Sequence, residues 1–282
     1  MVQNSISSLS KEEHETLSRY LQNHFSAHTE TADEDLSFLD FWRNFIVVLE
    51  KDGAERAINT MLIPQRSVAL AEPAAITARI HMAEAGEIPV ISVGNSEDFE
   101  NIIVNLVHKG KRPEKIGATG ASFIYGKTTR FIILSAKPYS NVSAATLGLD
   151  EADWQKKSME IRLAHECTHF FTKRFFGASQ NHLHDELMAD FFGMMAAFGY
   201  YTAEYFEYFM GIKGTEGSRL SYYIPDCSER LFAALKEIAS AAAHWLEDWS
   251  HSKDYAAMSH AERIRFLCGT NLALMAGIES LV

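Results

Sequence analysis

The segment that follows Asp150 most constrains what this chain can fold into, because it reads as one long, capped helix. Asp150 fits the N-cap position, and Glu151 and Asp153 place carboxylates in the first turn, where the helix dipole favours them. Apolar residues then recur at helical spacing from Trp154 to Phe176, and Gly177 provides a stop. The sequence therefore predicts a helix over residues 154–176.

Inside this helix the chain reads HECTH, which places His165, Glu166 and His169 within little more than one turn. Histidines at positions i and i+4 share one face of a helix, so both imidazoles can reach the same ion. A catalytic zinc ion typically has three protein ligands and a water, and a glutamate directly after the first histidine can take a proton from that water. The pattern predicts two metal ligands and a general base.

The residues around this motif are apolar on nearly every side: Leu163, Ala164, Phe170 and Phe171. Such surroundings predict a buried helix, where three ionisable side chains are costly unless they are paired or bound to a metal. This argument favours metal ligation over three ordinary surface residues. Cys167 lies at a variable position of the motif and points away from the metal face, so we interpret it as a small buried hydrophobe.

Helices are also expected at both ends of the chain. Near the N-terminus, Ser10 and Glu13 form a capping-box pattern, and residues 38–49 carry a wide apolar face at helical spacing. In the C-terminal part, helices are expected over residues 184–198, 228–249 and 260–280.

The middle of the chain is richer in β-prone residues. Residues 88–94 read as a short strand, and a helix is expected from Asn95 or Ser96 to a stop at Gly110. Residues 121–135 contain two β-prone runs that flank Gly126 and Lys127, which predicts a hairpin.

Together these elements predict an α+β fold that is predominantly helical, with a small β-rich middle region followed by the HExxH helix and C-terminal helices. Three regions are distinguished: an N-terminal helical region over residues 1–65, an α/β region over 66–149 with an edge-strand candidate, and a helical metal-binding region over 150–282. No linker-like composition separates them, so the alternative of one compact domain stays open.

The composition argues against several classes of function. The chain has 26 Lys and Arg against 37 Asp and Glu, a net charge of −11, and no basic surface for nucleic acid is expected. We expect neither a signal peptide nor a membrane span, because the first residues lack a basic stretch before an apolar run and no segment is sufficiently apolar. Three widely spaced cysteines do not suggest disulfides, so we expect a cytoplasmic protein.

A third metal ligand decides which metalloproteins the motif resembles. The metzincin pattern would continue with a glycine and a histidine where this chain has Thr172 and Phe175. Instead, seventeen residues after His169, Glu186 opens a second predicted helix, and Asp190 lies one turn further along the same face. An HExxH helix followed by ExxxD on a second helix resembles the gluzincin branch of the zincin metallopeptidases. The resemblance covers residues 165–190.

The resemblance implies one zinc ion per chain, bound by His165, His169 and Glu186. It implies that Glu166 is the general base. Asp190 matches the aspartate that holds a ligand imidazole by its other nitrogen, which fixes the ring and raises its basicity.

Alternatives remain for the ligands and for the remaining catalytic groups. His182 and His184 stand in the same segment as Glu186, and either one as third ligand would give a three-histidine site. Enzymes of this branch usually place a histidine or tyrosine near the developing oxyanion, and the candidates here are Tyr222, Tyr223 and His244.

Zincins also commonly present an edge strand ahead of the HExxH helix, along which an extended peptide can pair. The candidate here is the run over residues 123–135, with Arg130 as a contact. A hairpin that only covers the core is the alternative interpretation.

The resemblance implies a zinc-dependent hydrolase, in the first place a metallopeptidase that cleaves a peptide or amide bond by glutamate-assisted attack of zinc-bound water. Its partner would be a peptide or protein substrate, with no nucleic acid and no membrane. Two alternatives stay open: a zincin-like regulatory or partner-specific protein with little general activity, and a helical binding protein whose HExxH is coincidental.

Overall fold

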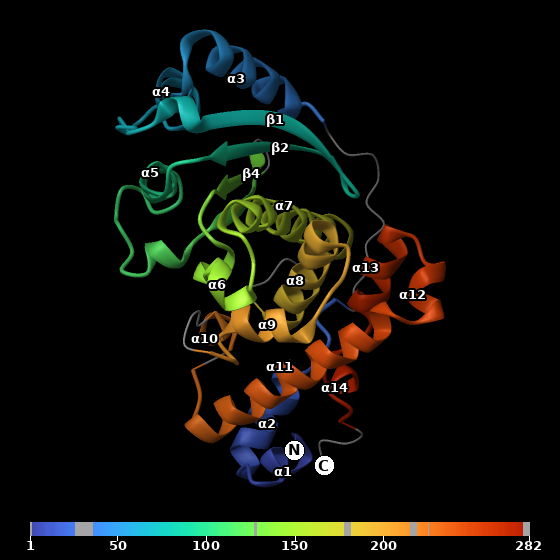
Figure 1. Ribbon diagram of the computed structural model, residues 1–282. Coiled ribbons are helices and arrows are strands. Elements are labelled where there is room, and N and C mark those ends of the chain that lie inside the picture. The colour runs from blue at the N-terminus through green and yellow to red at the C-terminus, as the bar shows by residue number, and fades with distance from the viewer. Residues whose placement is uncertain are drawn as a thin grey trace.

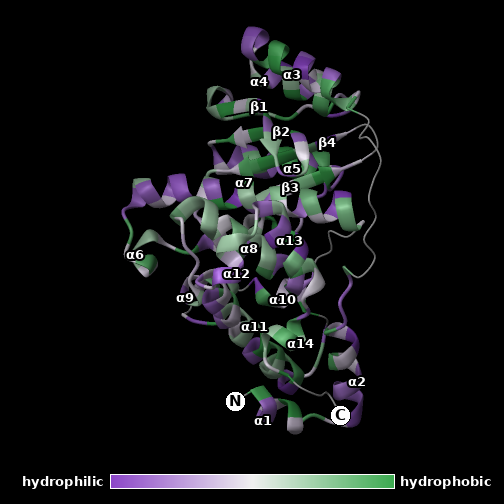
Figure 2. Ribbon diagram, turned by 90° about the vertical axis from the view of Figure 1, so that its right-hand side faces the viewer, coloured by the Kyte–Doolittle hydropathy of each residue, from purple (hydrophilic) through white to green (hydrophobic). Residues whose placement is uncertain are grey.

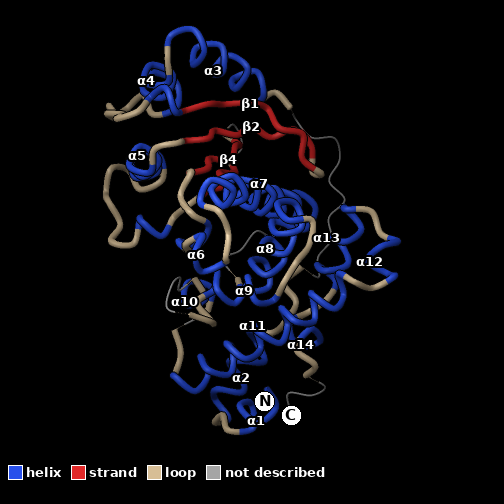
Figure 3. Tube along the Cα trace, viewed as in Figure 1, coloured by secondary structure: helices blue, strands red, loops and turns tan. Residues whose placement is uncertain are grey.

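The computed structural model describes residues 2–25, 36–126, 129–177, 182–214, 219–224 and 226–278. A small sheet lies between a cap of helices and a larger helical body (Figures 1 and 3). The chain is 62% helical and the sheet has four strands, which confirms the predicted α+β, predominantly helical class. Over the described ranges, no helix combines the length and the apolar character that crossing a membrane requires.

The strand order of the sheet is β1-β2-β4-β3. β1 (Ile76–Ala83) and β2 (Gly86–Val93) form an antiparallel hairpin, and β2 pairs in parallel with β4 (Arg130–Ser135). β3 (Ala121–Tyr125) pairs antiparallel with β4, which confirms the hairpin predicted over residues 121–135. Lys127 in its predicted turn lies outside the described residues. β2 confirms the strand predicted over 88–94, whereas β1 is a strand that was not predicted.

Helix α5 (Ser96–Leu106) follows β2 and lies on the connection that leads to β3 and β4. Of the two predicted N-caps, Asn95 is the one observed, and it accepts hydrogen bonds from two backbone N–H groups of the first turn. The helix ends four residues before the predicted stop at Gly110. Gly110 nevertheless caps the C-terminal end of the helix. Its N–H donates to the carbonyl of Val104 at 2.9 Å, and its φ is positive.

Both faces of the two central strands are buried, and alternate residues serve different cores. Four side chains on one face pack with α3 (Phe38–Asp52) and α5: Ile91, Val93, Phe131 and Ile133. Three side chains on the other face belong to the larger core that includes α7: Val90, Ile132 and Leu134. This two-sided burial explains why β2 and β4 read as nearly continuous apolar runs, and Figure 2 shows them as apolar ribbons inside the molecule.

The predicted motif helix is α7 (Glu151–Phe176), which packs against β3 and β4. The side chain of Asp150 accepts hydrogen bonds from the backbone of the first turn, and Gly177 follows the last turn in the left-handed conformation. Both predicted ends are therefore confirmed. The second predicted helix is α8 (Leu183–Phe198), which packs along α7.

The described residues of the predicted N-terminal region lie at opposite ends of the molecule (Figure 1). α1 (Val2–Ser7) and α2 (Lys11–Tyr20) lie near the C-terminal helix α11 (Glu229–Ser250), and α2 begins with the predicted capping box of Ser10 and Glu13. α3 and α4 (Ala54–Ala57) cover the sheet instead. These residues therefore do not pack together as one unit.

The other helices of the body are short: α6 (Ala144–Leu147), α9 (Ala203–Met210), α10 (Leu220–Tyr223), α12 (Lys253–Ala257), α13 (His260–Gly269) and α14 (Leu272–Met275). α11 confirms the helix predicted over 228–249. The single helix predicted over 260–280 is wrong, because the chain is extended at Thr270 and starts a new helix after Asn271. The Asn271 side chain accepts a hydrogen bond from the N–H of Leu274. Asparagine is more favourable at such an N-cap than inside a helix.

Candidate metal centre

Helices α7 and α8 run antiparallel and approach closely enough to bring their polar residues together. Gly193 of α8 rests against Ile161 of α7, where a Cβ atom would lie 2.8 Å from Ile161 Cγ2 and 2.9 Å from its carbonyl oxygen. A side chain at this position would push the helices apart. Asp190 and Glu186, which precede Gly193 on α8, consequently face the histidines of α7.

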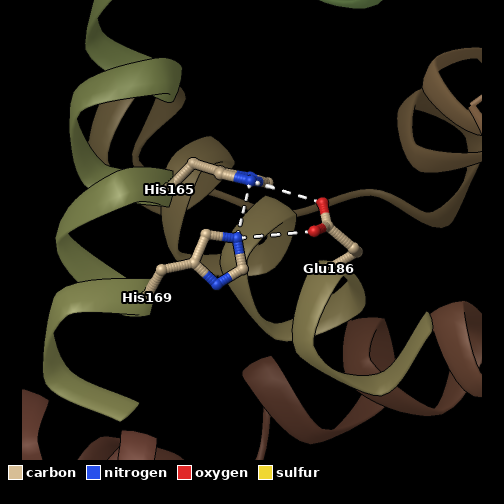
Figure 4. A group of neighbouring side chains, drawn as sticks. All are labelled: His165, His169 and Glu186. Carbon is tan, nitrogen blue, oxygen red and sulfur yellow. Dashed lines mark hydrogen bonds and ion pairs between the residues drawn. The ribbon is translucent and has the colours of Figure 1, made fainter. Parts of the chain in front are cut away.

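Three side chains converge between the two helices (Figure 4). Nε2 of His165 lies 3.0 Å from Nε2 of His169. Glu186 reaches across from α8, with Oε2 3.4 Å from His165 Nε2 and Oε1 3.5 Å from His169 Nε2. All three side chains are buried. Within the described part of the chain, this is the one group of three or more His, Cys, Asp or Glu residues placed so that it could hold a metal ion.

These distances fit a tetrahedral zinc ion. Ligand atoms at about 2.0–2.1 Å from zinc stand about 3.3–3.4 Å from one another in a tetrahedron. The two Nε2 atoms are 3.0 Å apart, and each faces a different oxygen of Glu186, at 3.4 and 3.5 Å; these separations are close to that value. Two imidazole nitrogens and one carboxylate oxygen are also a donor set that zinc prefers. The residues present therefore fit the ion that the sequence motif implies.

Each histidine faces a carboxylate with its other ring nitrogen. Nδ1 of His165 lies 2.9 Å from Asp190 Oδ1, and the hydroxyl of Tyr139 lies 3.0 Å from the same Nδ1 while it donates to Asp190. Nδ1 of His169 faces Oδ1 of Asp185 at 3.7 Å, which is longer than a hydrogen bond. Such partners orient imidazole rings, so that Nε2 is the atom presented to the centre.

Arg219, the residue before α10, connects the carboxylates of α8. Its guanidinium donates to Glu186 Oε2 at 3.0 Å, to Asp190 Oδ2 at 3.1 Å and to the hydroxyl of Tyr139 at 3.1 Å. Burial would raise the pKa of Asp190, but Arg219 and His165 hold that pKa below its ordinary value. Arg219 thus helps to keep Asp190 ionised and ties it to Glu186.

The pKa shifts of the three central residues show that they are strongly coupled. Burial by itself would lower the pKa of each histidine, but the neighbouring carboxylates outweigh it. The pKa of His165 is therefore raised, and that of His169 lies well above its ordinary value. Burial would raise the pKa of Glu186, yet its contacts with both imidazoles hold that pKa well below the ordinary range. The carboxylates around His165 and His169 therefore favour a positive charge at the position between them.

A cavity of about 300 Å³ opens beside this centre. His165 and Glu166 form part of its wall, together with Gly120 and Ala121 at the start of β3. Burial raises the pKa of the Glu166 carboxyl, although the two neighbouring histidines oppose the shift. A carboxylate with a raised pKa, at the wall of a cavity and beside the metal-type donors, has the properties of a general base.

The predicted oxyanion donors fall into two groups. Tyr222 and Tyr223 both line the cavity. Nε of Arg219 donates to the Tyr223 hydroxyl at 3.1 Å, and burial raises the pKa of that hydroxyl, so it keeps its proton. His244 lies elsewhere: its side chain is 61% exposed on α11 beside Glu207 and Glu247.

The other histidines proposed as ligands point away from the centre. Nε2 of His182 lies 3.1 Å from the carbonyl of Tyr20, and its Nδ1 accepts from the N–H of His184 as the cap of α8. Nε2 of His184 lies 3.1 Å from the carbonyl of Leu267. Cys167 lines a second cavity, away from the three donors, and burial raises the pKa of its thiol to about 12.

Three residues of the site were not identified from the sequence: Tyr139, Arg162 and Arg219. Tyr139 comes from a short turn after β4, next to Ser140, which has a φ of 54°. Arg219 comes from a segment without a helical or strand signal. Arg162 alone had a local signal, because it stands three residues before His165 on the same helix and therefore on nearly the same face.

Comparison with known protein families places the chain in one of them. Residues 56–129 and 127–279 match a family described as a family of unknown function (DUF7005), and these ranges cover most of the chain. The protein belongs to this family, and the matched residues include both helices of the candidate metal centre. Searches of curated proteins and of solved structures found no match. An assignment of function must therefore rest on the site.

Proposed function

We propose that the protein is a zinc-dependent hydrolase that cleaves a peptide or amide bond, with a zincin-like centre of the gluzincin type. The observation that supports this most directly is the convergence of His165, His169 and Glu186 at zinc-like spacing, with Glu166 on the wall of the adjoining cavity. A hydrogen-bonded polar cluster without a metal would need neither three donors aimed at one point nor a cavity beside them.

The residues of the centre divide the chemical work. A bound zinc ion would polarise the substrate carbonyl and lower the pKa of a nearby water molecule. Glu166 takes the proton from the attacking water, since its raised pKa makes it a better base than an exposed carboxylate. Protonated Glu166 then gives the proton to the leaving amine.

Tyr223 is the residue that the geometry favours as the oxyanion donor. Its hydroxyl oxygen accepts a hydrogen bond from Arg219, which leaves its own hydrogen to donate into the cavity. Donors of this kind stabilise the charge that develops on a carbonyl oxygen as water attacks. Arg219 has two roles in this proposal, because it orients Tyr223 and also ties Glu186 to Asp190.

The position of β3 supports a peptide as the substrate. Among the described strands β3 pairs only with β4, so its other edge has no strand partner, and its first residue, Ala121, lines the cavity. An extended peptide can add to such an edge by backbone hydrogen bonds. We therefore propose β3, the first strand of the predicted hairpin, as the edge strand along which a peptide would pair.

Metal analysis of the purified protein is the first test. We expect one zinc per chain in the wild type and less than a tenth of that in His165→Ala and Glu186→Ala. Absence of stoichiometric zinc from folded wild-type protein would overturn the proposal.

Activity on a peptide library, with and without Glu166→Gln, is the second test. Glu166 is not among the three donors, so the variant should keep its zinc while turnover falls by about a thousand-fold or more. Equal turnover in the two proteins would remove Glu166 as the base.

A further inference from the structure

Tyr20, the last residue of α2, contacts two elements of the candidate centre with a single hydroxyl group. The hydroxyl donates a hydrogen bond to the backbone carbonyl of Tyr223 at 2.7 Å and accepts one from the N–H of Leu183 at 3.2 Å. Tyr223 is the last residue of α10, and Leu183 is the first residue of α8. The hydroxyl of Tyr20 therefore links the end of one helix of the site to the start of the other.

Both partners of this hydroxyl are backbone groups that helix geometry leaves without an intrahelical hydrogen bond. The last carbonyls of a helix and its first N–H groups are of this kind. The carbonyl of Tyr223 belongs to the end of α10, and the N–H of Leu183 belongs to the start of α8. A hydroxyl can donate and accept at the same atom, so it can serve both groups at once. Phenylalanine at residue 20 would serve neither.

The ring of Tyr20 is held in place by residues outside α10. It stacks on the imidazole of His182, with ring centroids 4.2 Å apart and an interplanar angle of 28°. Nδ1 of His182 accepts from a backbone N–H, so Nε2 carries the hydrogen and donates to the carbonyl of Tyr20 at 3.1 Å. Leu17 and Leu21, on either side of Tyr20 in the sequence, are buried in the larger core. The position of the hydroxyl is thus set by α2 and the N-cap of α8.

α10 depends on such contacts because it is very short. It has four residues, and a single helical turn has little stability of its own. Arg219 holds its first end through ion pairs with α8, and Tyr20 holds its last end. Leu220 and Ile224 add buried apolar contacts. Both polar anchors lead to α8, so α10 is positioned relative to the helix that carries Glu186.

Tyr223 is the residue of α10 whose placement depends most on the second anchor. Its hydroxyl accepts from Nε of Arg219 at 3.1 Å and its carbonyl accepts from Tyr20, so the residue is held at its side chain and at its backbone. As an oxyanion donor, the hydroxyl of Tyr223 must lie at hydrogen-bond distance from the developing charge. A displacement of about 1 Å can lower a catalytic rate by about 100-fold.

We infer that Tyr20 is a positioning residue of the centre: its hydroxyl fastens the end of α10 to the start of α8 and so sets where the hydroxyl of Tyr223 lies relative to the three metal-type donors. This inference rests on the proposed function. It makes α2 a part of the site, although none of the residues of α2, all of which the structure describes, lines the cavity.

A double-mutant cycle between Tyr20 and Tyr223 tests the inference in steady-state assays. Tyr20→Phe should lower kcat by about ten-fold, with zinc content unchanged and KM changed by no more than about three-fold, because the contacts with metal and substrate remain. In the Tyr223→Phe background the same substitution should lower kcat by no more than about two-fold, since the hydroxyl that it misplaces is already absent. A purely structural loss would lower kcat by the same factor in both backgrounds.

Asn23→Ala is the matched control for the attachment of this N-terminal segment. Nδ2 of Asn23 donates to the carbonyl of Cys268 on α13 at 2.8 Å, so the substitution removes another contact of the same segment and leaves that with Tyr223 in place. Its kcat should stay within about two-fold of the wild-type value. Circular dichroism verifies that each variant is folded.

Hydrogen-exchange mass spectrometry tests the same contact without turnover. In Tyr20→Phe, the peptide that covers residues 219–224 should exchange about ten-fold faster than in the wild type, with and without zinc, because a hydrogen bond that holds α10 is lost. Peptides from β2 and from the middle of α7 should exchange at the wild-type rate. Asn23→Ala should leave the exchange of residues 219–224 unchanged.

The outcomes separate this inference from the proposed function. Wild-type exchange of residues 219–224 in Tyr20→Phe, an unchanged kcat in that variant, or the same factor of loss in both backgrounds would overturn the role of Tyr20. Each of these results could accompany stoichiometric zinc and glutamate-dependent hydrolysis. Conversely, a protein without zinc in which Tyr20→Phe still accelerates exchange over α10 would retain the fastening contact and lose the hydrolase.

Discussion

Two clusters of histidines lie on opposite sides of the first turn of α8, and they differ in what surrounds them. The zinc-type cluster consists of His165, His169 and Glu186, whose donor atoms converge. The aromatic cluster consists of His24, His182 and His184, whose rings pack against one another with centroids 4.5 Å apart for His24–His182 and 5.7 Å for His24–His184.

The difference shows that carboxylates, rather than histidine density, create a metal-type site here. In the zinc-type cluster both imidazoles contact carboxylates, which raise the pKa of each ring. In the aromatic cluster, His182 and His184 contact backbone carbonyls, and burial lowers their pKa values to about 4 and about 3. These rings are neutral packing groups, and each points its nitrogens at a different partner.

The strongest test of this comparison is to substitute one residue of each cluster. Glu186→Gln should lower zinc affinity by more than about 100-fold, because a direct ligand matters more than the partners behind it. His182→Asn, which keeps an N-cap for α8 and loses the imidazole, should leave zinc affinity unchanged. Competition with a chromophoric chelator measures both. A larger loss of zinc affinity in His182→Asn than in Glu186→Gln would place the metal in the aromatic cluster and contradict the comparison.

A second prediction concerns the cavity side of the zinc-type cluster. Tyr223→Phe should lower kcat by about 100-fold or more through loss of one oxyanion donor. Zinc content and KM should change little, because the hydroxyl contacts neither His165 nor His169. Tyr222→Phe is the matched control on the same cavity wall. Equal kcat values for wild type and Tyr223→Phe in steady-state assays would assign the oxyanion to another donor.

A third, smaller effect is expected from the carboxylate behind His165. Asp190→Asn keeps the shape of the side chain but removes its charge, so zinc affinity should fall by about 10–100-fold. Arg219 would lose part of its ion pairing in this variant, and a lower Tm should accompany the change. Zinc affinity equal to that of the wild type would show that Asp190 does not support the ligand.

The smallest effect is expected in the aromatic cluster. Both ring nitrogens of His24 are buried without a hydrogen-bond partner among the described residues, so His24→Leu should stabilise the fold by about 1 kcal/mol at neutral pH. Burial also lowers the pKa of His24. Below about pH 6.5 the unfolded chain therefore takes up a proton more readily than the folded chain. The folded protein becomes less stable as the pH falls.

His24→Leu removes this loss, so its advantage over the wild type should widen as the pH falls from about 6.5 to 5. Urea unfolding at several pH values measures the difference. A variant that is less stable than the wild type across this range would show that His24 makes a favourable polar contact.

Local spacing explains why much of the candidate site could be predicted from the sequence. The i, i+4 spacing within HECTH puts both histidines on one helix face, and the ExxxD spacing puts Glu186 and Asp190 on one face of the next helix. Both relations depend only on helix geometry. The two ends of α7 were predicted for the same reason, because Asp150 and Gly177 each cap the helix turn next to them in the sequence.

The rest of the site depends on contacts between distant parts of the chain. Arg219 reaches Tyr139 across 80 residues, and neither residue belongs to a recurring pattern. The close approach at Gly193 that joins α7 to α8 also leaves no mark that distinguishes it from any helical glycine. Tertiary packing alone selects these residues, and sequence periodicity does not encode it.

The missed strand β1 has a different cause. Polar Thr77, Arg79 and His81 alternate in it with apolar residues that face α3, which is the pattern of an edge strand covered on one face. The signal was present but weaker than that of β2, whose central residues are apolar on both faces.

Zinc anomalous diffraction from crystals of the protein tests the central claim most directly. We expect one anomalous peak per chain, bounded by Nε2 of His165, Nε2 of His169 and the carboxylate of Glu186, with Glu166 beside it and no peak among His24, His182 and His184. A peak in the aromatic cluster, or crystals grown with zinc in which His165 and His169 hydrogen-bond without any metal between them, would contradict the account.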